Sequence, residues 1–217
     1  MNDTVELYAK QGMGQKIGFG SKPALLIVDM QNDFCDADAP STLHPSILST
    51  VTPIKQLAEA ARAKKVPVIY TQGLVAADGS SAGLWRYKMK HHGLGNVQIE
   101  GSRGAAIIDE LAPQPGDRII RKWRPSAFFR TDLEVFLGVA GIDTLLLTGT
   151  SISGCVRATA TDAFMRDIRP MIVREGIADR TQAVLEANLF DLQQKYADVV
   201  SLDECLTYLD TLDRQNT

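Results

Sequence analysis

Three residues whose side chains could support nucleophilic catalysis stand at the ends of predicted strands. Cys155 follows a short apolar run and a glycine-containing turn, and Asp29 and Lys122 each end a run of strand-forming residues. Open α/β sheets bind ligands at the carboxyl ends of their strands. If the three strands are neighbours in one parallel sheet, the three side chains converge there. The sequence then predicts a thiol nucleophile beside a carboxylate and an ammonium group.

Each residue also has an ordinary interpretation when it is taken alone. Cys155 could be a small core side chain, Asp29 a turn former or helix cap, and Lys122 a solvated amine. The stretch at 156–166 predicts a helix, so Cys155 stands in its first turn, where the partial positive charge predicts a lowered thiol pKa. The occurrence of all three residues at strand ends favours the catalytic interpretation.

Alternating strand and helix patterns must position these side chains. Strand-like runs lie at residues 24–29, 66–71, 117–122, 143–149, 169–174 and 197–200. Helical patterns occupy residues 47–64, 156–166, 182–195 and 201–209, and two pairs with capping-box spacing are Thr131 with Glu134 and Ser201 with Glu204. The alternation predicts a single α/β domain over residues 1–217. We expect a three-layer αβα, Rossmann-like fold with a six-stranded, largely parallel sheet covered on both faces.

Composition argues against several functional classes. The net charge of −3 gives no basic surface for a nucleic-acid partner. No apolar run approaches the roughly 20 residues that cross a membrane, and residues 1–6 lack the features of a secretory signal. The three cysteines have no metal-like spacing, and their number suits a reducing cytoplasm. A dinucleotide or redox module is disfavoured, since no Gly-x-Gly-x-x-Gly follows a strand and no Cys-x-x-Cys occurs.

Residues 72–103 are rich in glycine and lack clear periodicity. They contain Trp85 and Tyr87 together with the adjacent His91 and His92. Loops of this length are uncommon in compact domains and often act as lids or binding loops. Two interpretations stay open, a lid over the substrate and a contact between subunits.

Several segments resemble the isochorismatase-like cysteine hydrolases, and the similarity covers nearly the whole chain. The segments are Leu-Ile-Val-Asp-Met-Gln-Asn-Asp-Phe at 26–34, Lys122 with Pro-Ser-Ala-Phe at 125–128, and Gly-Thr-Ser-Ile-Ser-Gly-Cys-Val at 149–156. Stretches at 169–175 and 186–192 are similar to the N-carbamoylsarcosine and maleamate amidohydrolase branch.

This resemblance implies an Asp–Lys–Cys triad formed by Asp29, Lys122 and Cys155. It also implies a cis peptide bond between Thr150 and Ser151, with Thr150 and Ser151 as substrate-binding residues. The backbone N–H groups of Ser151 and Cys155 would then form an oxyanion hole.

Two departures from other branches narrow the chemistry. Isochorismatases that hydrolyse an ether lack this cysteine, so the presence of Cys155 favours amide chemistry. The nicotinamidase branch binds a metal through an Asp-x-His motif after the second strand, whereas residues 70–74 here read Tyr-Thr-Gln-Gly-Leu. The sequence therefore predicts neither a metal nor another cofactor.

The resemblance and the residues together predict an amidohydrolase that releases ammonia through a thioester. Arg180 follows the fifth strand, and in the carbamoylsarcosine and maleamate amidases an arginine at the matching position binds the substrate carboxylate. The alternative for Arg180 is a salt bridge to Asp179 or Glu175. A carboxylate-bearing amide resembling N-carbamoylsarcosine or maleamate is the expected substrate. Biuret, ureidoacrylate and a non-catalytic binding role are alternatives.

The resemblance also implies a homo-oligomer, either a dimer or a tetramer. The segments at 7–19 and 72–103 are the surfaces expected to form its subunit contacts.

Overall fold

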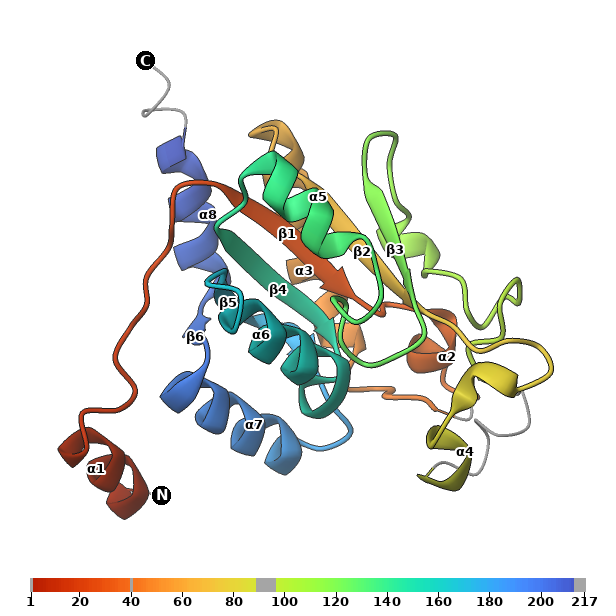
Figure 1. The fold of residues 1–217 in the computed structure, drawn as a ribbon, viewed down its shortest axis with the longest axis horizontal. Helices are drawn as coiled ribbons and strands as arrows, with labels where there is room; N and C mark the ends of the chain where they lie inside the picture. The colour runs from red at the N-terminus through yellow and green to blue at the C-terminus, as the bar shows by residue number, and fades with distance from the viewer. Residues whose placement is uncertain (1, 40, 89–96, 213–217) are drawn as a thin grey trace.

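The strands form one parallel sheet, whose order in the computed structural model is β3-β2-β1-β4-β5-β6 (Figure 1). The structure describes residues 2–39, 41–88 and 97–212. All pairings between neighbouring strands are parallel, so the predicted six-stranded sheet is confirmed. The strands are β1 (Pro23–Val28), β2 (Val68–Gly73), β3 (Arg118–Lys122), β4 (Thr144–Thr150), β5 (Arg169–Ala178) and β6 (Asp198–Val200).

Helices cover both faces of this sheet. The α-helices of the described residues are α1 (Asn2–Lys10), α2 (Asn32–Cys35), α3 (Leu48–Ala63), α4 (Trp85–Lys88), α5 (Leu133–Ala140), α6 (Arg157–Phe164), α7 (Gln182–Lys195) and α8 (Leu202–Thr211), and those that cover the sheet are α3, α5, α6, α7 and α8. None of the described helices is long and apolar enough to cross a membrane.

The core has two halves, because successive side chains of a strand point to opposite faces of the sheet. Leu25 and Ile27 of β1 belong to the half that α3 and α8 complete. Ala24, Leu26 and Val28 belong to the half completed by α5, α6 and α7. The helix α1 lies outside this three-layer body, beside α7 (Figure 1).

Two local predictions had different outcomes. The capping box at Ser201 is confirmed, since its hydroxyl accepts the Glu204 N–H and the Glu204 carboxylate accepts the Ser201 N–H. The capping box at Thr131 is wrong. The Thr131 hydroxyl donates to the carbonyl of Ala127 at 2.5 Å and accepts the N–H of Leu133, the first residue of α5, at 3.3 Å. The cap position is Asp132 rather than Thr131, and the Glu134 carboxylate accepts from Arg166, so no reciprocal pair forms.

Two predicted segments also end elsewhere. The fifth strand does not stop at residue 174 but continues as β5 to Ala178, where it pairs with Thr150 after an irregularity in the β4–β5 register. The helix after Cys155 ends at Phe164 and begins at Arg157, behind a π-helical turn at Ile152–Val156. β5 therefore extends along β4 as far as the turn that carries the cysteine.

Gly149 allows the two central strands to lie close together at the edge where the site forms. It has a φ of +100°, and it is paired with Val28 of β1. A Cβ atom at this position would stand 2.1 Å from the Val28 carbonyl oxygen. No side chain fits there without separating β1 from β4.

We therefore expect Gly149→Ala to lower the free energy of unfolding by at least about 2 kcal/mol, through strain and displacement of β1. Gly138→Ala is the matched control, because no heavy atom lies within 4 Å of a Cβ built at this site in α5. Replacing a glycine inside a helix by alanine should raise the free energy of unfolding by about 0.5–1 kcal/mol. Urea denaturation of both variants measures these changes, and equal stability of the two would contradict the assigned role of Gly149.

Candidate active site

A buried ion pair occupies the carboxyl edge of the sheet. The Nζ atom of Lys122 lies 2.7 Å from Oδ2 of Asp29, and the exposed fractions of their side chains are 2% and 0%. Burial alone lowers the pKa of Lys122, but the negative charge of Asp29 and the hydrogen bond to it outweigh this effect and the pKa is raised. Lys122 is therefore a cation inside the protein, held by its carboxylate partner.

The ion pair spans three strands. Asp29 directly follows β1 and Lys122 ends β3, while β2 lies between these strands. The three strands are therefore not all neighbours, since only β1 and β4 are adjacent, and yet their side chains converge. The long lysine side chain covers the distance past β2, where the residue in register with Lys122 is Gly73.

The intervening strand also orients Asp29. Thr71 of β2 donates its hydroxyl to Oδ1 of Asp29 at 2.6 Å, and it accepts the Asp29 N–H at 3.0 Å. Asp29 has a φ of +50°, a conformation that non-glycine residues rarely adopt and that persists where the surroundings enforce it. One carboxylate oxygen thus faces Thr71 and the other faces Lys122.

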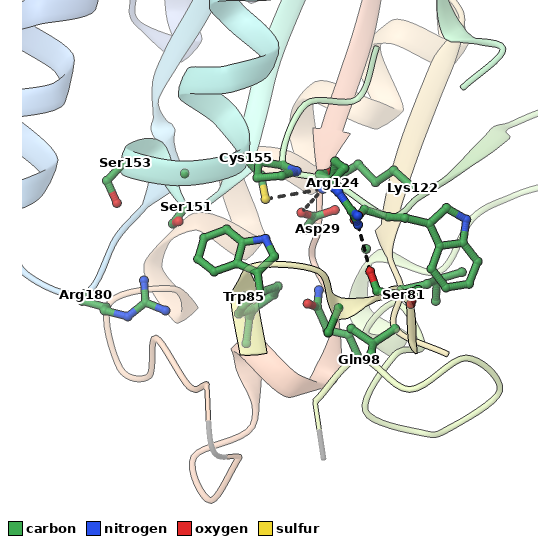
Figure 2. A pocket seen from close by; sticks show the side chains of 18 residues that line it. Asp29, Ser81, Trp85, Gln98, Lys122, Arg124, Ser151, Ser153, Cys155 and Arg180 are labelled. Atoms are coloured by element: carbon green, nitrogen blue, oxygen red, sulfur yellow. Dashed lines mark hydrogen bonds and ion pairs between the residues drawn. The ribbon is translucent and has the colours of Figure 1, made fainter. Parts of the chain in front are cut away.

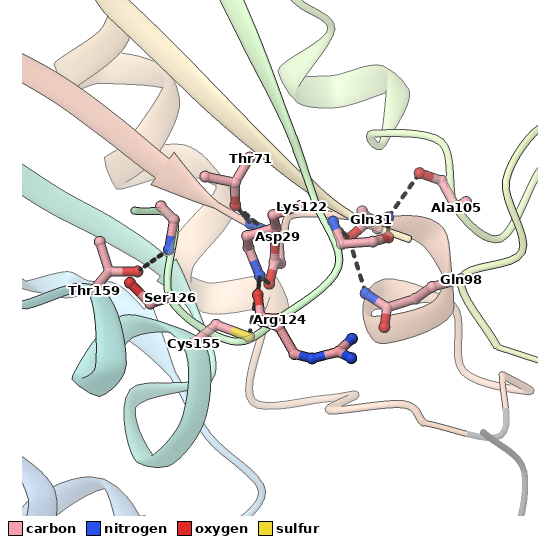
Figure 3. A network of polar contacts seen from close by, with 12 residues as sticks. Asp29, Gln31, Thr71, Gln98, Ala105, Lys122, Arg124, Ser126, Cys155 and Thr159 are labelled. Atoms are coloured by element: carbon pink, nitrogen blue, oxygen red, sulfur yellow. Dashed lines mark hydrogen bonds and ion pairs between the residues drawn. The ribbon is translucent and has the colours of Figure 1, made fainter. Parts of the chain in front are cut away.

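Cys155 brings its sulfur to the same ammonium group. Lys122 Nζ lies 3.4 Å from Cys155 Sγ, so it contacts both the carboxylate and the thiol (Figure 3). The cysteine lies in the π-helical turn between β4 and α6, and it is only partly buried. π-helical turns are rare and are frequent at functional sites. The three residues that the sequence singled out are together in one cluster.

The resting nucleophile is a protonated thiol. Burial raises the pKa of Cys155 to about 12, the Asp29 charge raises it as well, and the Lys122 charge offsets only part of this effect. The predicted lowering of this pKa by the start of the helix is therefore wrong. The carboxylate of Asp29 lies in the same cluster as this thiol and shares the Lys122 ammonium group with it.

A cavity of about 360 Å³ opens over the cluster (Figure 2). Its lining residues are Asp29, Phe34, Gly73, Leu74, Val75, Ser81, Ala82, Trp85, Gln98, Lys122, Trp123, Arg124, Pro125, Ser151, Ser153, Gly154, Cys155 and Arg180. Five of the six predicted site residues are among them. Thr150 is fully buried, and its hydroxyl has no hydrogen-bond partner in the part of the chain that the structure describes. The peptide bond between Thr150 and Ser151 is cis.

The turn before Cys155 is tied to the end of β5. The buried carboxylate of Asp179 accepts the Ser153 N–H and the Arg180 N–H, each at 2.7 Å. The guanidinium of Arg180 is about half exposed and lies 3.9 Å from Asp179, a loose contact. Glu175, the other partner considered for Arg180, accepts the N–H of Leu202.

Part of the long loop covers the cavity. Ser81, Trp85 and Gln98 line it, and Arg124 donates from Nη1 to the Ser81 carbonyl at 2.9 Å. These positions favour the lid interpretation for residues 81–85. His91 and His92 lie outside the described residues. Within the described ranges no group of three or more His, Cys, Asp or Glu residues is arranged to hold a metal ion.

Sequence reasoning missed three residues of this site. Gln98 lies in a segment without periodicity, and nothing in its neighbourhood marks it. Arg124 follows the catalytic lysine candidate by two residues, and this proximity was the one available signal. Asp179 was considered only as a possible partner for the Arg180 side chain, whereas its contacts are to backbone N–H groups.

Comparisons with known proteins agree with this arrangement. The family described as Isochorismatase domain matches residues 23–204. The N-carbamoylsarcosine amidase of Arthrobacter sp is 39% identical over 211 residues, which cover 95% of this chain and 78% of that protein. The maleamate amidohydrolase of Pseudomonas putida is 38% identical over 200 residues, covering 90% and 91%. A crystal structure of a cysteine hydrolase from Pseudomonas syringae pv. phaseolicola 1448A has a TM-score of 0.85 at 26% identity, covering 92% of this chain and 98% of that one.

The raised thiol pKa generates a prediction that needs no substrate. In Asp29→Asn the carboxylate charge that raises the pKa of Cys155 is gone and Lys122 remains, so the thiol pKa should fall. Alkylation of Cys155 by iodoacetamide at pH 8 should then become at least about tenfold faster, since the thiolate is the reactive form.

Peptide mass mapping identifies the labelled residue, and Cys155→Ser reports the background from the buried Cys35 and Cys205. Unchanged or slower labelling of Asp29→Asn would contradict the assigned cause of the high pKa.

Proposed function

The chain belongs to the isochorismatase domain family, and we propose that it is a cysteine amidohydrolase that releases ammonia from a small carboxylate-bearing amide or N-carbamoyl compound. Relatives covering 90% or more of the chain are named as an amidase and an amidohydrolase of non-peptide C–N bonds. The observation that carries the proposal is the contact of Lys122 Nζ with both Asp29 and Cys155 Sγ beneath one cavity.

In the first half of the reaction, Cys155 Sγ attacks the carbonyl carbon of the amide while Asp29 takes the thiol proton. The positive charge of Lys122 stabilises the developing thiolate, which burial would otherwise disfavour. The backbone N–H groups of Ser151 and Cys155 are proposed to bind the carbonyl oxygen as it gains negative charge. Asp29 then delivers the proton to the nitrogen, the C–N bond breaks, and ammonia leaves a thioester on Cys155.

In the second half, Asp29 accepts a proton from a water molecule that attacks the thioester carbon. The C–S bond breaks, and the proton returns to the sulfur, so that the carboxylic acid leaves and the thiol is restored. One carboxylate serves both halves because it begins and ends each of them unprotonated. The ammonium group of Lys122, 2.7 Å from Oδ2 of Asp29, offsets the carboxylate charge at this position.

The carboxylate in the proposed substrate follows from Arg180. Its guanidinium lines the cavity and has only a loose contact with Asp179, so it is available for bidentate binding of a carboxylate. N-Carbamoylsarcosine and maleamate are small acids of this kind, and the relatives named for them support this choice. Biuret, which is neutral, and ureidoacrylate are the alternative substrates.

We also propose that the protein forms a homo-oligomer and acts in the cytoplasm. Leu84 and Tyr87 at the end of the lid segment have exposed fractions of 79% and 80%, which supports a subunit contact beside the cavity. Sedimentation equilibrium of the purified protein tests the dimer or tetramer that we expect.

Purified enzyme should release ammonia from at least one member of a panel containing N-carbamoylsarcosine, maleamate, ureidoacrylate, biuret and nicotinamide. Cys155→Ser should release none, because the hydroxyl is a poorer nucleophile at the same position. Asp29→Asn should also be inactive, with no proton acceptor beside the sulfur. Ammonia release at the native rate by either variant would refute the role assigned to that residue, and a folded wild-type enzyme that is silent on small amides would refute the proposed function.

Arg180→Ala should raise KM for an anionic substrate by about tenfold to a hundredfold, since a charge-assisted hydrogen bond contributes roughly 1.5–3 kcal/mol. KM for a neutral amide should change little. Arg174→Ala is the matched control, because this arginine lies on β5, just before Arg180 in the chain, but pairs with Glu186 away from the cavity. Initial-rate kinetics distinguish the two variants. An unchanged KM for the anionic substrate in Arg180→Ala would contradict the assignment of Arg180 as the residue that binds the carboxylate.

A further inference from the structure

Gln98 is held at the cavity by an unusual number of restraints. Its backbone has a φ of +54°, its N–H donates to the carboxylate of Asp33, and its carbonyl accepts the Val75 N–H at 2.8 Å. Its side chain donates from Nε2 to Oε1 of Gln31 at 3.0 Å. A strained residue that its surroundings fix in this way is a common feature of functional sites.

The hydrogen bonds of Gln31 determine which end of the Gln98 amide faces which way (Figure 3). Gln31 Nε2 donates to the carbonyls of Gly73 and Ala105, and Gln31 Oε1 accepts the Gly73 N–H. Gln31 Oε1 is thus fixed as an acceptor, and only the Nε2 end of Gln98 can bind to it.

The other end of this amide is an acceptor without a partner. Gln98 is 7% exposed and lines the cavity, and no hydrogen bond formed within the described ranges involves its Oε1 atom. This oxygen is not among the buried side-chain atoms that lack a partner, so it is open to the cavity and a donor can reach it there. The cavity is therefore built to receive an N–H or O–H group at this point.

The position of Gln98 within the cavity indicates which part of the substrate provides that donor. In Figure 2 Arg180 and Gln98 lie on opposite sides of Trp85, and Cys155 lies between them across the view. A substrate whose carboxylate binds Arg180 and whose carbonyl carbon meets Cys155 directs its amide nitrogen toward Gln98. An amide N–H is a donor, whereas the corresponding ester oxygen is not.

We propose that Gln98 is a specificity-determining residue, whose Oε1 accepts a hydrogen bond from the scissile amide nitrogen and so selects amides over esters. This inference rests on the proposed function and deepens it. As Asp29 protonates the departing nitrogen, the N–H groups of that nitrogen become stronger donors. Their hydrogen bond to Gln98 therefore strengthens toward the transition state. Gln98 thereby assists departure of ammonia as well as recognition.

The experiment compares each amide with the ester of the same acid in wild-type enzyme and in Gln98→Met. The pairs are maleamate with monomethyl maleate, and N-carbamoylsarcosine with N-(methoxycarbonyl)sarcosine. Methionine has a similar length and no strong acceptor, so kcat/KM for the amide should fall about tenfold to a hundredfold. For the ester it should stay within about threefold, because no N–H is lost.

Two further variants control for structural damage. Gln98→Gly removes the side chain at a backbone conformation that glycine adopts without strain, and it should show the same loss of amide preference. Gln72→Met removes a bond from Nε2 to the Ala105 carbonyl in the same region but away from the cavity, and its amide-to-ester ratio should equal that of the wild type.

A parallel fall of amide and ester rates in both Gln98 variants, or an unchanged ratio, would overturn the inference while the proposed function stands. A wild-type enzyme that hydrolyses neither amide nor any other member of the panel would overturn the proposed function itself, and the inference with it.

Discussion

The buried ion pair between Asp29 and Lys122 is the constraint on which the rest of the site depends. Removing two charges from water is tolerated only when each has a partner, and breaking such a pair typically costs about 3–5 kcal/mol. Here the pair lies at the edge of the sheet with exposed fractions of 0% and 2%. Its geometry requires β1 and β3 to keep a fixed separation, with Thr71 of the strand between them oriented toward the carboxylate.

The same pair determines the state of the nucleophile. A thiol beside a lysine with no other partner would ionise readily. Here the charge of Lys122 is balanced by Asp29 and the site is buried, so the thiol keeps its proton. Its pKa of about 12 reflects burial of the thiol first and the charge of Asp29 second, with Lys122 offsetting only part of these effects. In the proposed reaction, bond formation to the substrate carbonyl and transfer of the thiol proton to Asp29 therefore occur together.

Much of the fold and the centre of the site could be predicted from the sequence, because buried parallel strands are short apolar runs and helices have their own period. Asp29, Lys122 and Cys155 follow such runs, so their positions along the chain already indicated one edge. The wrong details all depend on tertiary contacts. Local spacing could not predict three features. These are the strand between Asp29 and Lys122, the hydrogen bond from Thr131 to the Ala127 carbonyl, and the sign of the thiol pKa shift. Gln98 was invisible because its role arises from Gln31 and Asp33, residues more than 60 positions away.

The link between Asp179 and Arg180 has a consequence for how this scaffold can change. Asp179 anchors the cysteine-bearing turn through the Ser153 N–H, and it holds residue 180 chiefly through that residue's backbone N–H at 2.7 Å, since the guanidinium is 3.9 Å away. Every amino acid except proline supplies the same N–H group. The side chain at position 180 can therefore be exchanged without loosening the turn that aims the sulfur. In proteins with this fold, a single substitution at position 180 can therefore change the charge of the preferred substrate while the position of the sulfur stays the same.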